Sequence, residues 1–235
     1  MNELFLIRIF TYSILPLLLA TAYVLFDKNT HTRTQQIELF IIYLLAISVG
    51  ANGLGGAFGH IFYSDVVAEA IGWQAGSPFQ LEMGFANLTL GILGLIAVGR
   101  RDGFRTATII ATTVIGVGAT GVHLMDIIQH GNLSPGNTIQ NVGNLLDPIL
   151  LIALTSWASH LGETDPPSFV YWHMRHGMIA GFTAGGIGTG FAIGYAVGSL
   201  LPAILLGTLI GTGLGLMMTR NIIHTENTFA TDHQL

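Results

Sequence analysis

Long apolar runs separated by short polar segments make up most of the chain. A helix needs about 20 apolar residues to cross the hydrocarbon core of a bilayer. The pattern predicts seven such spans, at residues 4–26, 36–62, 79–99, 105–129, 138–160, 176–197 and 200–219. The sequence therefore predicts an all-α fold, a helical bundle integral to a membrane.

The basic residues predict the orientation of this bundle. Lys and Arg gather in cytoplasmic loops of membrane proteins. With seven spans, every Lys and Arg except Arg8 falls on one side, namely Lys28, Arg33, Arg100, Arg101, Arg105, Arg175 and Arg220. We therefore expect the N-terminus outside and the C-terminus inside.

Composition agrees with this interpretation and excludes several functions. The chain is 51% hydrophobic and only 9% charged, against about 25% charged in soluble domains. It has no Cys, which excludes disulfides, thiolate metal sites and cysteine catalysis. No basic patch is present that would bind nucleic acid. The expected location is the cell membrane, with the lipid bilayer as the main partner.

Glycines set the last two spans apart from the first five. They recur at intervals that let helix backbones approach closely, at Gly186, Gly190, Gly194, Gly198, Gly207, Gly211 and Gly215. We expect a five-helix core at 1–162, a Gly-rich two-helix hairpin at 163–221 and a polar tail at 222–235. The hairpin is also the expected contact for a homo-oligomer or a larger membrane complex.

Three ionisable residues near the outer end of span four point to a site. His123, Asp126 and His130 are spaced i, i+3 and i+7, which places them in one narrow stripe of a helix. An Asp at membrane depth costs roughly 2.5–3.5 kcal/mol on the insertion scale. Something must offset this cost, so the stripe is a candidate for function.

Neighbouring spans place further polar residues at a similar depth. His60 ends span two, Glu82 begins span three, and Asp147 lies deeper on span five. The predicted metal or proton site consists of His60, Glu82, His123 and Asp126. The predicted pocket around it is lined by His130, Asp147, Asn144, Gln140 and Trp73.

We expect this outer-facing pocket to bind a metal ion, a proton or a small polar ligand. Three chemistries fit these residues, and no catalytic residue can be assigned. Neutral His and carboxylates can bind a metal ion, two His can hold haem, and His with Asp and Glu can relay protons or bind a translocated cation. A metal ion ranks above haem, which normally needs His deeper in a bundle. The function classes left open are a redox or metal-dependent membrane enzyme, a proton- or ion-coupled transporter, and a non-catalytic structural subunit.

Several motifs carry a resemblance. They are Gly-His60-Ile-Phe, the block Gly72-Trp73-Gln-Ala-Gly-Ser-Pro-Phe79-Gln, and His130-Gly-Asn-x-x-Pro-Gly-Asn137. Over about residues 36–152 the chain resembles a family of small prokaryotic multi-spanning membrane proteins of unassigned function. Members of that family typically have about four spans, so the Gly-rich hairpin is a departure. The resemblance implies no activity.

Overall fold

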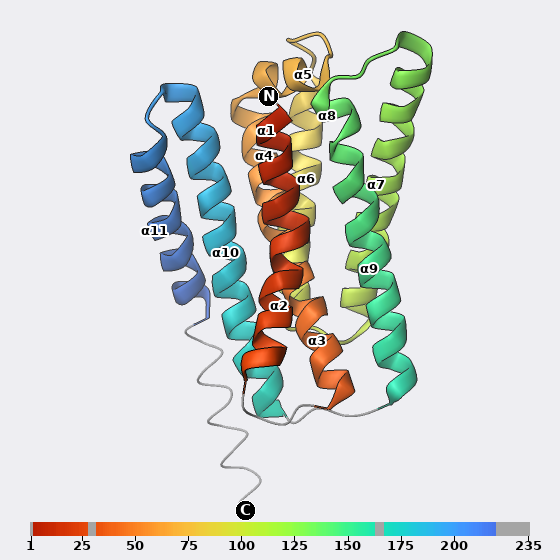
Figure 1. Cartoon of the computed structure of the whole chain (residues 1–235), viewed down its shortest axis with the longest axis vertical. Coiled ribbons are helices and arrows are strands. Elements are labelled where there is room, and N and C mark those ends of the chain that lie inside the picture. Colours follow the sequence, from red (N-terminus) through yellow and green to blue (C-terminus); the bar gives the residue numbers. More distant parts are fainter. Residues whose placement is uncertain (1, 28–31, 163–166, 220–235) are drawn as a thin grey trace, which may run out of the picture.

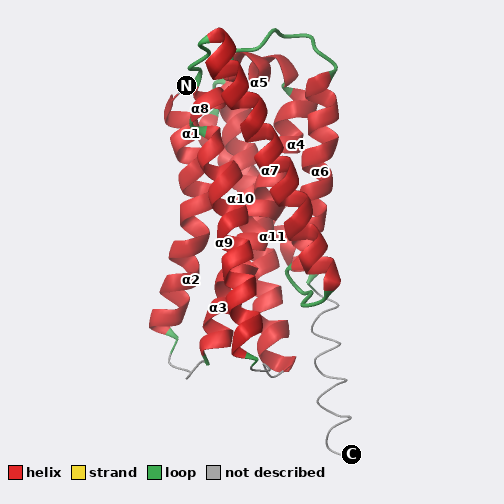
Figure 2. Cartoon of the chain, turned by 90° about the vertical axis from the view of Figure 1, so that its right-hand side faces the viewer, coloured by secondary structure: helices red, strands yellow, loops and turns green. Residues whose placement is uncertain are grey.

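The structure, a computed structural model, describes residues 2–27, 32–162 and 167–219. These residues form helices and contain no strand (Figures 1 and 2). The prediction of an all-α fold is therefore confirmed. The predicted polar tail at 222–235 lies outside the described residues.

The helices pack side by side into one elongated bundle (Figure 1). Several of them join end to end into longer rods, and a short helix, α5, covers one end of the bundle. In chain order the elements are α1 (Asn2–Ile9), the π-helix η1 (Phe10–Ile14), α2 (Leu15–Phe26), α3 (Arg33–Tyr43), the π-helix η2 (Leu44–Ala51), α4 (Asn52–Phe62), α5 (Ser64–Ile71), α6 (Phe79–Ala97), α7 (Gly103–His130), α8 (Pro135–Thr138), α9 (Gln140–Leu161), α10 (Pro167–Val197) and α11 (Leu200–Met218).

Among the described residues, six helical stretches are long and apolar enough to cross a membrane. They are Phe5–Phe26, Arg33–Phe62, Phe79–Ala97, Gly103–His130, Pro135–Leu161 and Leu200–Met217. Each overlaps a span predicted from the sequence. The remaining predicted span, 176–197, lies within α10, a helix of 31 residues that is about 46 Å long at 1.5 Å per residue.

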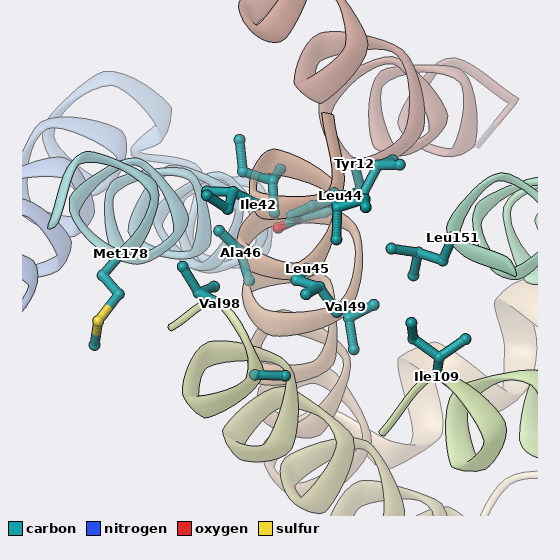
Figure 3. Close-up of a cluster of buried hydrophobic side chains, with 14 of the residues drawn as sticks. Tyr12, Ile42, Leu44, Leu45, Ala46, Val49, Val98, Ile109, Leu151 and Met178 are labelled. Carbon is teal, nitrogen blue, oxygen red and sulfur yellow. The ribbon is translucent and has the colours of Figure 1, made fainter. Parts of the chain in front are cut away.

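The rod α3–η2–α4 forms the centre of the bundle. In its most apolar window 78% of the residues are buried inside the protein, against 22% for the rod at Phe5–Phe26. Leu44, Leu45 and Ala46 are completely buried, and side chains from several other helices surround them (Figure 3). The whole core is therefore assembled around this rod.

Two prolines inside helices each leave a carbonyl without its usual donor, because proline has no backbone N–H. Pro16 deprives the Tyr12 carbonyl four residues earlier, and the Ser48 hydroxyl of η2 donates a hydrogen bond to that carbonyl instead. This bond joins the two π-helical segments η1 and η2, which pack against each other. π-Helical turns of this kind are frequent at functional sites.

Pro148 has the same effect on the Asn144 carbonyl of α9. The backbone of α7 meets this carbonyl at Gly116, where a Cβ atom would overlap with the Asn144 oxygen. A Cα–H···O contact of this type gives a carbonyl a weak replacement donor. Gly116 is therefore required for the close approach of α7 and α9.

Glycines also bring α4 and α6 together. A Cβ on Gly53 would lie 2.6 Å from the Gly91 Cα, and one on Gly94 would lie 2.8 Å from the Gly50 nitrogen. This pairing was not predicted from the sequence, although Gly91 and Gly94 have the spacing of a helix face. It fixes α6 against the central rod.

The glycines of the C-terminal hairpin fall on two faces of α10. Gly186 and Gly190 abut backbone carbonyls of α11, and Gly207 of α11 abuts the Gly186 carbonyl in return. Gly177 and Gly181 face the central rod instead, against Ile42 and the Ala46 carbonyl. α10 therefore packs tightly on α11 and on the core at once.

A buried ion pair fixes the opposite end of the bundle from α5. Arg105 was predicted to be a loop cation, but its side chain is only 5% exposed and donates two hydrogen bonds, of 2.7 and 3.0 Å, to the buried carboxylate of Glu38. It also donates to the Ala97 and Val98 carbonyls at the end of α6. One guanidinium thus joins α3, α6 and α7.

Substitution of Gly116 by Ala tests the contact between α7 and α9. The added methyl would overlap with the Asn144 carbonyl, so Gly116→Ala should lower the free energy of unfolding by about 1–3 kcal/mol, as overpacking does. The control is Gly118→Ala on the same helix, where a Cβ meets nothing within 4 Å. That variant should be as stable as the wild type or up to about 1 kcal/mol more stable. Unfolding in detergent measures both, and equal stabilities would refute the close approach.

Candidate functional site

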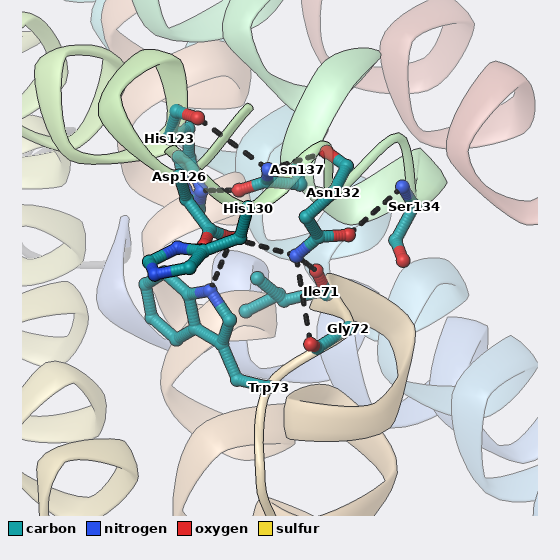
Figure 4. A network of polar contacts seen from close by, with 9 residues as sticks. All are labelled: Ile71, Gly72, Trp73, His123, Asp126, His130, Asn132, Ser134 and Asn137. Atoms are coloured by element: carbon teal, nitrogen blue, oxygen red, sulfur yellow. Dashed lines mark hydrogen bonds and ion pairs between the residues drawn. The ribbon is translucent and has the colours of Figure 1, made fainter. Parts of the chain in front are cut away.

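Six side chains at the α5 end of the bundle form one polar cluster, which we call the Trp73 cluster: Trp73, His123, Asp126, His130, Asn132 and Asn137 (Figure 4). They come from the loop after α5, from the end of α7 and from the segment that leads into α9. The cluster therefore joins the loop after α5 and the loop after α7 to α7 itself.

Asp126 is the centre of the cluster. Its carboxylate accepts hydrogen bonds from the Trp73 indole N–H at 2.9 Å and from the Asn132 amide at 2.6 Å. The His130 ring, one helical turn along α7, lies 2.8 Å from its other oxygen. The Asp126 side chain is 16% exposed and the His130 side chain 68% exposed. The carboxylate is held in place by three donors, and the imidazole remains open to the surroundings.

His123 is buried in the bundle beneath Trp73. Its ring stacks on the indole with centroids 5.4 Å apart, and its Nδ1 lies 2.6 Å from the Asn137 side-chain oxygen. Because an amide oxygen only accepts, Nδ1 of His123 carries the proton. The Asn137 amide donates in turn to the Asn132 carbonyl. Both His123 and Asn137 are buried, so this half of the cluster is enclosed.

The local sequence explains how the two loops meet. Gly72 ends α5 with a φ of +82°, and Gly131 ends α7 with a φ of +66°, a region that favours glycine. Asn132 then donates to the Ile71 carbonyl and accepts from the Ser134 N–H. The Asn132 side chain thereby ties the turn after α7 to the end of α5.

Two hollows adjoin Trp73, and Val122 also lines both. The larger, of about 460 Å³, is lined by Trp73, Gln74, Ser77, Phe79, Gln80 and Val122. The smaller, of about 240 Å³, is lined by Trp73, Val122, Met125, Asp126, Gln129 and His130. Aromatic and aliphatic walls beside amides, a carboxylate and an imidazole suit a small ligand with both apolar and polar parts.

The residues of the predicted metal or proton site are not all together. His123 and Asp126 contact the same indole, but the His60 Nδ1 donates to the Gln80 side-chain oxygen at 2.7 Å. Glu82 is exposed in the first turn of α6. Within the described residues no three His, Asp or Glu side chains are grouped to hold a metal ion. His60 reaches the larger hollow only through Gln80.

The predicted pocket residues on α9 form a separate group. Gln140 donates a long hydrogen bond of 3.4 Å to the Asn144 side chain. Asp147 lies ten residues beyond Asn137, about 15 Å along the helix. It is 4% exposed, and one of its oxygens accepts from the Ser13 hydroxyl at 3.0 Å. Its other oxygen has no hydrogen-bond partner among the described residues.

Sequence reasoning missed three polar residues of this half of the bundle. Asn132 and Gln80 were not recognised as site residues, although an Asn directly after a helix-ending Gly is a signal for a side chain that bonds to turn backbone. Arg8 donates from Nε and Nη2 to the Asn52 side-chain oxygen, and no ion pair with a described carboxylate accompanies it. Its charge was noted only as an exception to the orientation rule.

Comparison with known proteins gives a family but no activity. Residues 8–164 match the model of a family described as "Family of unknown function (DUF6790)". No curated protein and no solved structure matches the chain. The matched region contains the Trp73 cluster, Asp147 and Arg8, and it ends before α10.

Substitution of Gly72 tests the junction of the two loops. Gly72 and Gly76 share a φ of +82°, but a Cβ on Gly72 would overlap with Ser134 and Asn132, whereas one on Gly76 meets nothing within 4 Å. Gly76→Ala should lose only the roughly 1–2 kcal/mol of a left-handed backbone. Gly72→Ala should lose more and also change the Trp73 emission, because the Asn132 contacts move. Equal losses with unchanged emission would show that the junction does not depend on this contact.

Proposed function

The chain belongs to this family of unknown function, and we propose that it is an integral membrane protein whose outer side binds a small polar ligand beside Trp73. The observation that carries the proposal is the position of both hollows against the indole that Asp126 and His123 hold. The Trp73 indole stacks on His123 and donates its N–H to Asp126. It is therefore held in position before a ligand binds.

Seven spans, with the N-terminus outside, account best for the helices and charges. α10 passes along the bundle beside α11 and the central rod and is longer than a span requires. Arg105 is neutralised by Glu38, so the orientation depends on the remaining basic residues, among them Arg33, Arg100 and Arg101. The α5 end then faces outward, together with the Trp73 cluster.

The charges at this end favour a ligand with a cationic group. Asp65 and Glu69 of α5, Glu82 of α6 and Asp126 are all acidic. The basic residue of this half, Arg8, is half-buried and donates to Asn52 of the central rod. An acidic surface attracts cations, and a Trp face binds quaternary ammonium groups. A chelated metal ion is less well supported, because the described residues offer no group of three ligands.

Labelling of single cysteines tests the orientation. The chain has no Cys, so Ser77→Cys in the loop before α6 and Gly103→Cys at the start of α7 each introduce one exposed thiol. A membrane-impermeant maleimide should label Ser77→Cys in intact cells and Gly103→Cys only after permeabilisation. The reverse pattern, or labelling of both in intact cells, would contradict the proposed orientation.

Fluorescence titration tests the ligand site. Choline should change the tryptophan emission of the purified protein and bind about tenfold more tightly than its neutral isostere 3,3-dimethylbutan-1-ol, since cation–π and charge interactions add about 1–2 kcal/mol. Trp73→Phe should abolish the response and Trp157→Phe should retain it, because Trp157 lies away from the hollows.

Asp126→Asn keeps the shape of the side chain and removes its charge. It should weaken choline binding about tenfold while Glu82→Gln has little effect, and thermal unfolding checks that both variants fold. Equal binding of choline and the neutral alcohol, or equal binding by wild type and Asp126→Asn, would show that the Trp73 cluster is only a structural junction.

A further inference from the structure

We propose that Asp147 is a second functional site, which binds a proton inside the bundle and exchanges it along the polar face of α9. The proposal rests on the membrane-spanning arrangement proposed above, but it is independent of any ligand at Trp73. It concerns a different helix, a deeper position and a different partner.

The contacts of Asp147 leave a charged carboxylate poorly compensated. The side chain is 4% exposed. Oδ2 accepts one hydrogen bond from a neutral hydroxyl, that of Ser13, and Oδ1 has no partner among the described residues. Burial of an isolated carboxylate is far more costly than burial of the neutral acid. A proton taken from water and added to Oδ1 removes the charge without breaking any other bond.

No neighbouring charge replaces that proton. α9 packs against α1, η1, η2, α3, α7 and α8, and no titratable side chain on these elements forms an ion pair or hydrogen bond with Asp147. Arg8 bonds to Asn52, and Glu38 pairs with Arg105. The other titratable groups are engaged elsewhere or lie at the ends and apolar faces of these helices: Glu3, Tyr12, Arg33, Tyr43, His123, Asp126 and His130.

A row of amides on α9 runs from the Trp73 cluster towards Asp147. Asn137 contacts His123, Asn141 donates to the Asn137 carbonyl, and Gln140 donates to Asn144, one turn before Asp147. Among the described residues, the Asn141 side-chain oxygen of α9 and the Thr120 hydroxyl of the neighbouring helix α7 are buried without a hydrogen-bond partner. Buried polar groups normally have a hydrogen-bond partner, so these atoms suit a path for proton exchange.

Infrared spectroscopy of the full chain in lipid vesicles tests the protonation of Asp147. At neutral pH the wild type should show the C=O band of a buried carboxylic acid, which Asp147→Asn should abolish. The control Asp65→Asn, an exposed carboxylate on α5, should retain the band. Ser13→Ala should shift its frequency, because the hydrogen bond to Oδ2 is lost.

Several outcomes would overturn the proposal. Absence of the band in the wild type would do so, as would a band that persists in Asp147→Asn. Disappearance of the band when N-methylglucamine is exchanged for sodium at constant pH would assign the site to a metal cation instead. Choline titration of Asp147→Asn separates the two proposals, since binding at Trp73 should remain within twofold of the wild type.

Hydrogen–deuterium exchange of the same band tests the path. Asn144→Leu should slow the exchange at least tenfold, because it interrupts the amide row one turn from the carboxyl. Val142→Leu, on the exposed side of α9, is the matched control and should leave the rate unchanged. Equal rates in the two variants would overturn the proposed route.

Discussion

The structure depends on one constraint, that polar groups within an apolar bundle must find their partners inside the protein. In the membrane that we propose for this bundle, lipid would offer no hydrogen bonds, so each unsatisfied group would cost several kcal/mol. The two helix-interior prolines show how closely the chain follows this constraint. The Ser48 hydroxyl meets the carbonyl freed by Pro16, and the Gly116 backbone meets the carbonyl freed by Pro148. Each of these contacts also holds two helices together, so the carbonyls freed by proline mark places where helices pack against each other.

The same constraint separates two kinds of polar site. The Trp73 cluster is almost completely satisfied, and Asp126 alone receives three donors. The Glu38–Arg105 pair is likewise complete, with the guanidinium also meeting two backbone carbonyls. Such networks hold their side chains in fixed positions. Asp147 is different, because a buried oxygen lacks a partner. The side chains of the Trp73 cluster are thus held in place by their hydrogen bonds, whereas Asp147 in the interior still has an oxygen free to take up a hydrogen-bond partner or a proton.

Depth along each helix could be predicted from the sequence, but position around the bundle axis could not. Apolar run lengths predicted where the six long apolar helices lie, and the cost of burial identified His123, Asp126 and Asp147 as buried or partly buried residues. His60 and Glu82 were grouped with them because they lie at a similar depth. The structure turns His60 toward Gln80 and leaves Glu82 exposed. Depth follows from residue count, whereas rotation depends on which helices pack together, and that is set by contacts far apart in sequence.

The burial of Arg105 could not be predicted for the same reason, because its partner is distant in the sequence. Its position near a helix start made it look like a loop cation, and only Glu38, 67 residues away, reveals it as a buried residue. The Gly53–Gly91 contact likewise could not be predicted without knowing which face of α4 packs against α6. Local signals did better where both partners are near in sequence, as with the His130–Asp126 pair one turn apart on α7.

The first rod, Asn2–Phe26, supplies polar partners to both the central rod and α9. It lies at the periphery, yet Arg8 reaches Asn52 of the central rod and Ser13 reaches Asp147 of α9. Ser13 belongs to η1, as does Tyr12, whose carbonyl accepts from Ser48. A change in the charge of Asp147 therefore acts first on Ser13, a residue of this π-helical segment. Because packed helices shift as units, this π-helical segment is where an event at the buried acid would first alter the contacts between the first rod and the core.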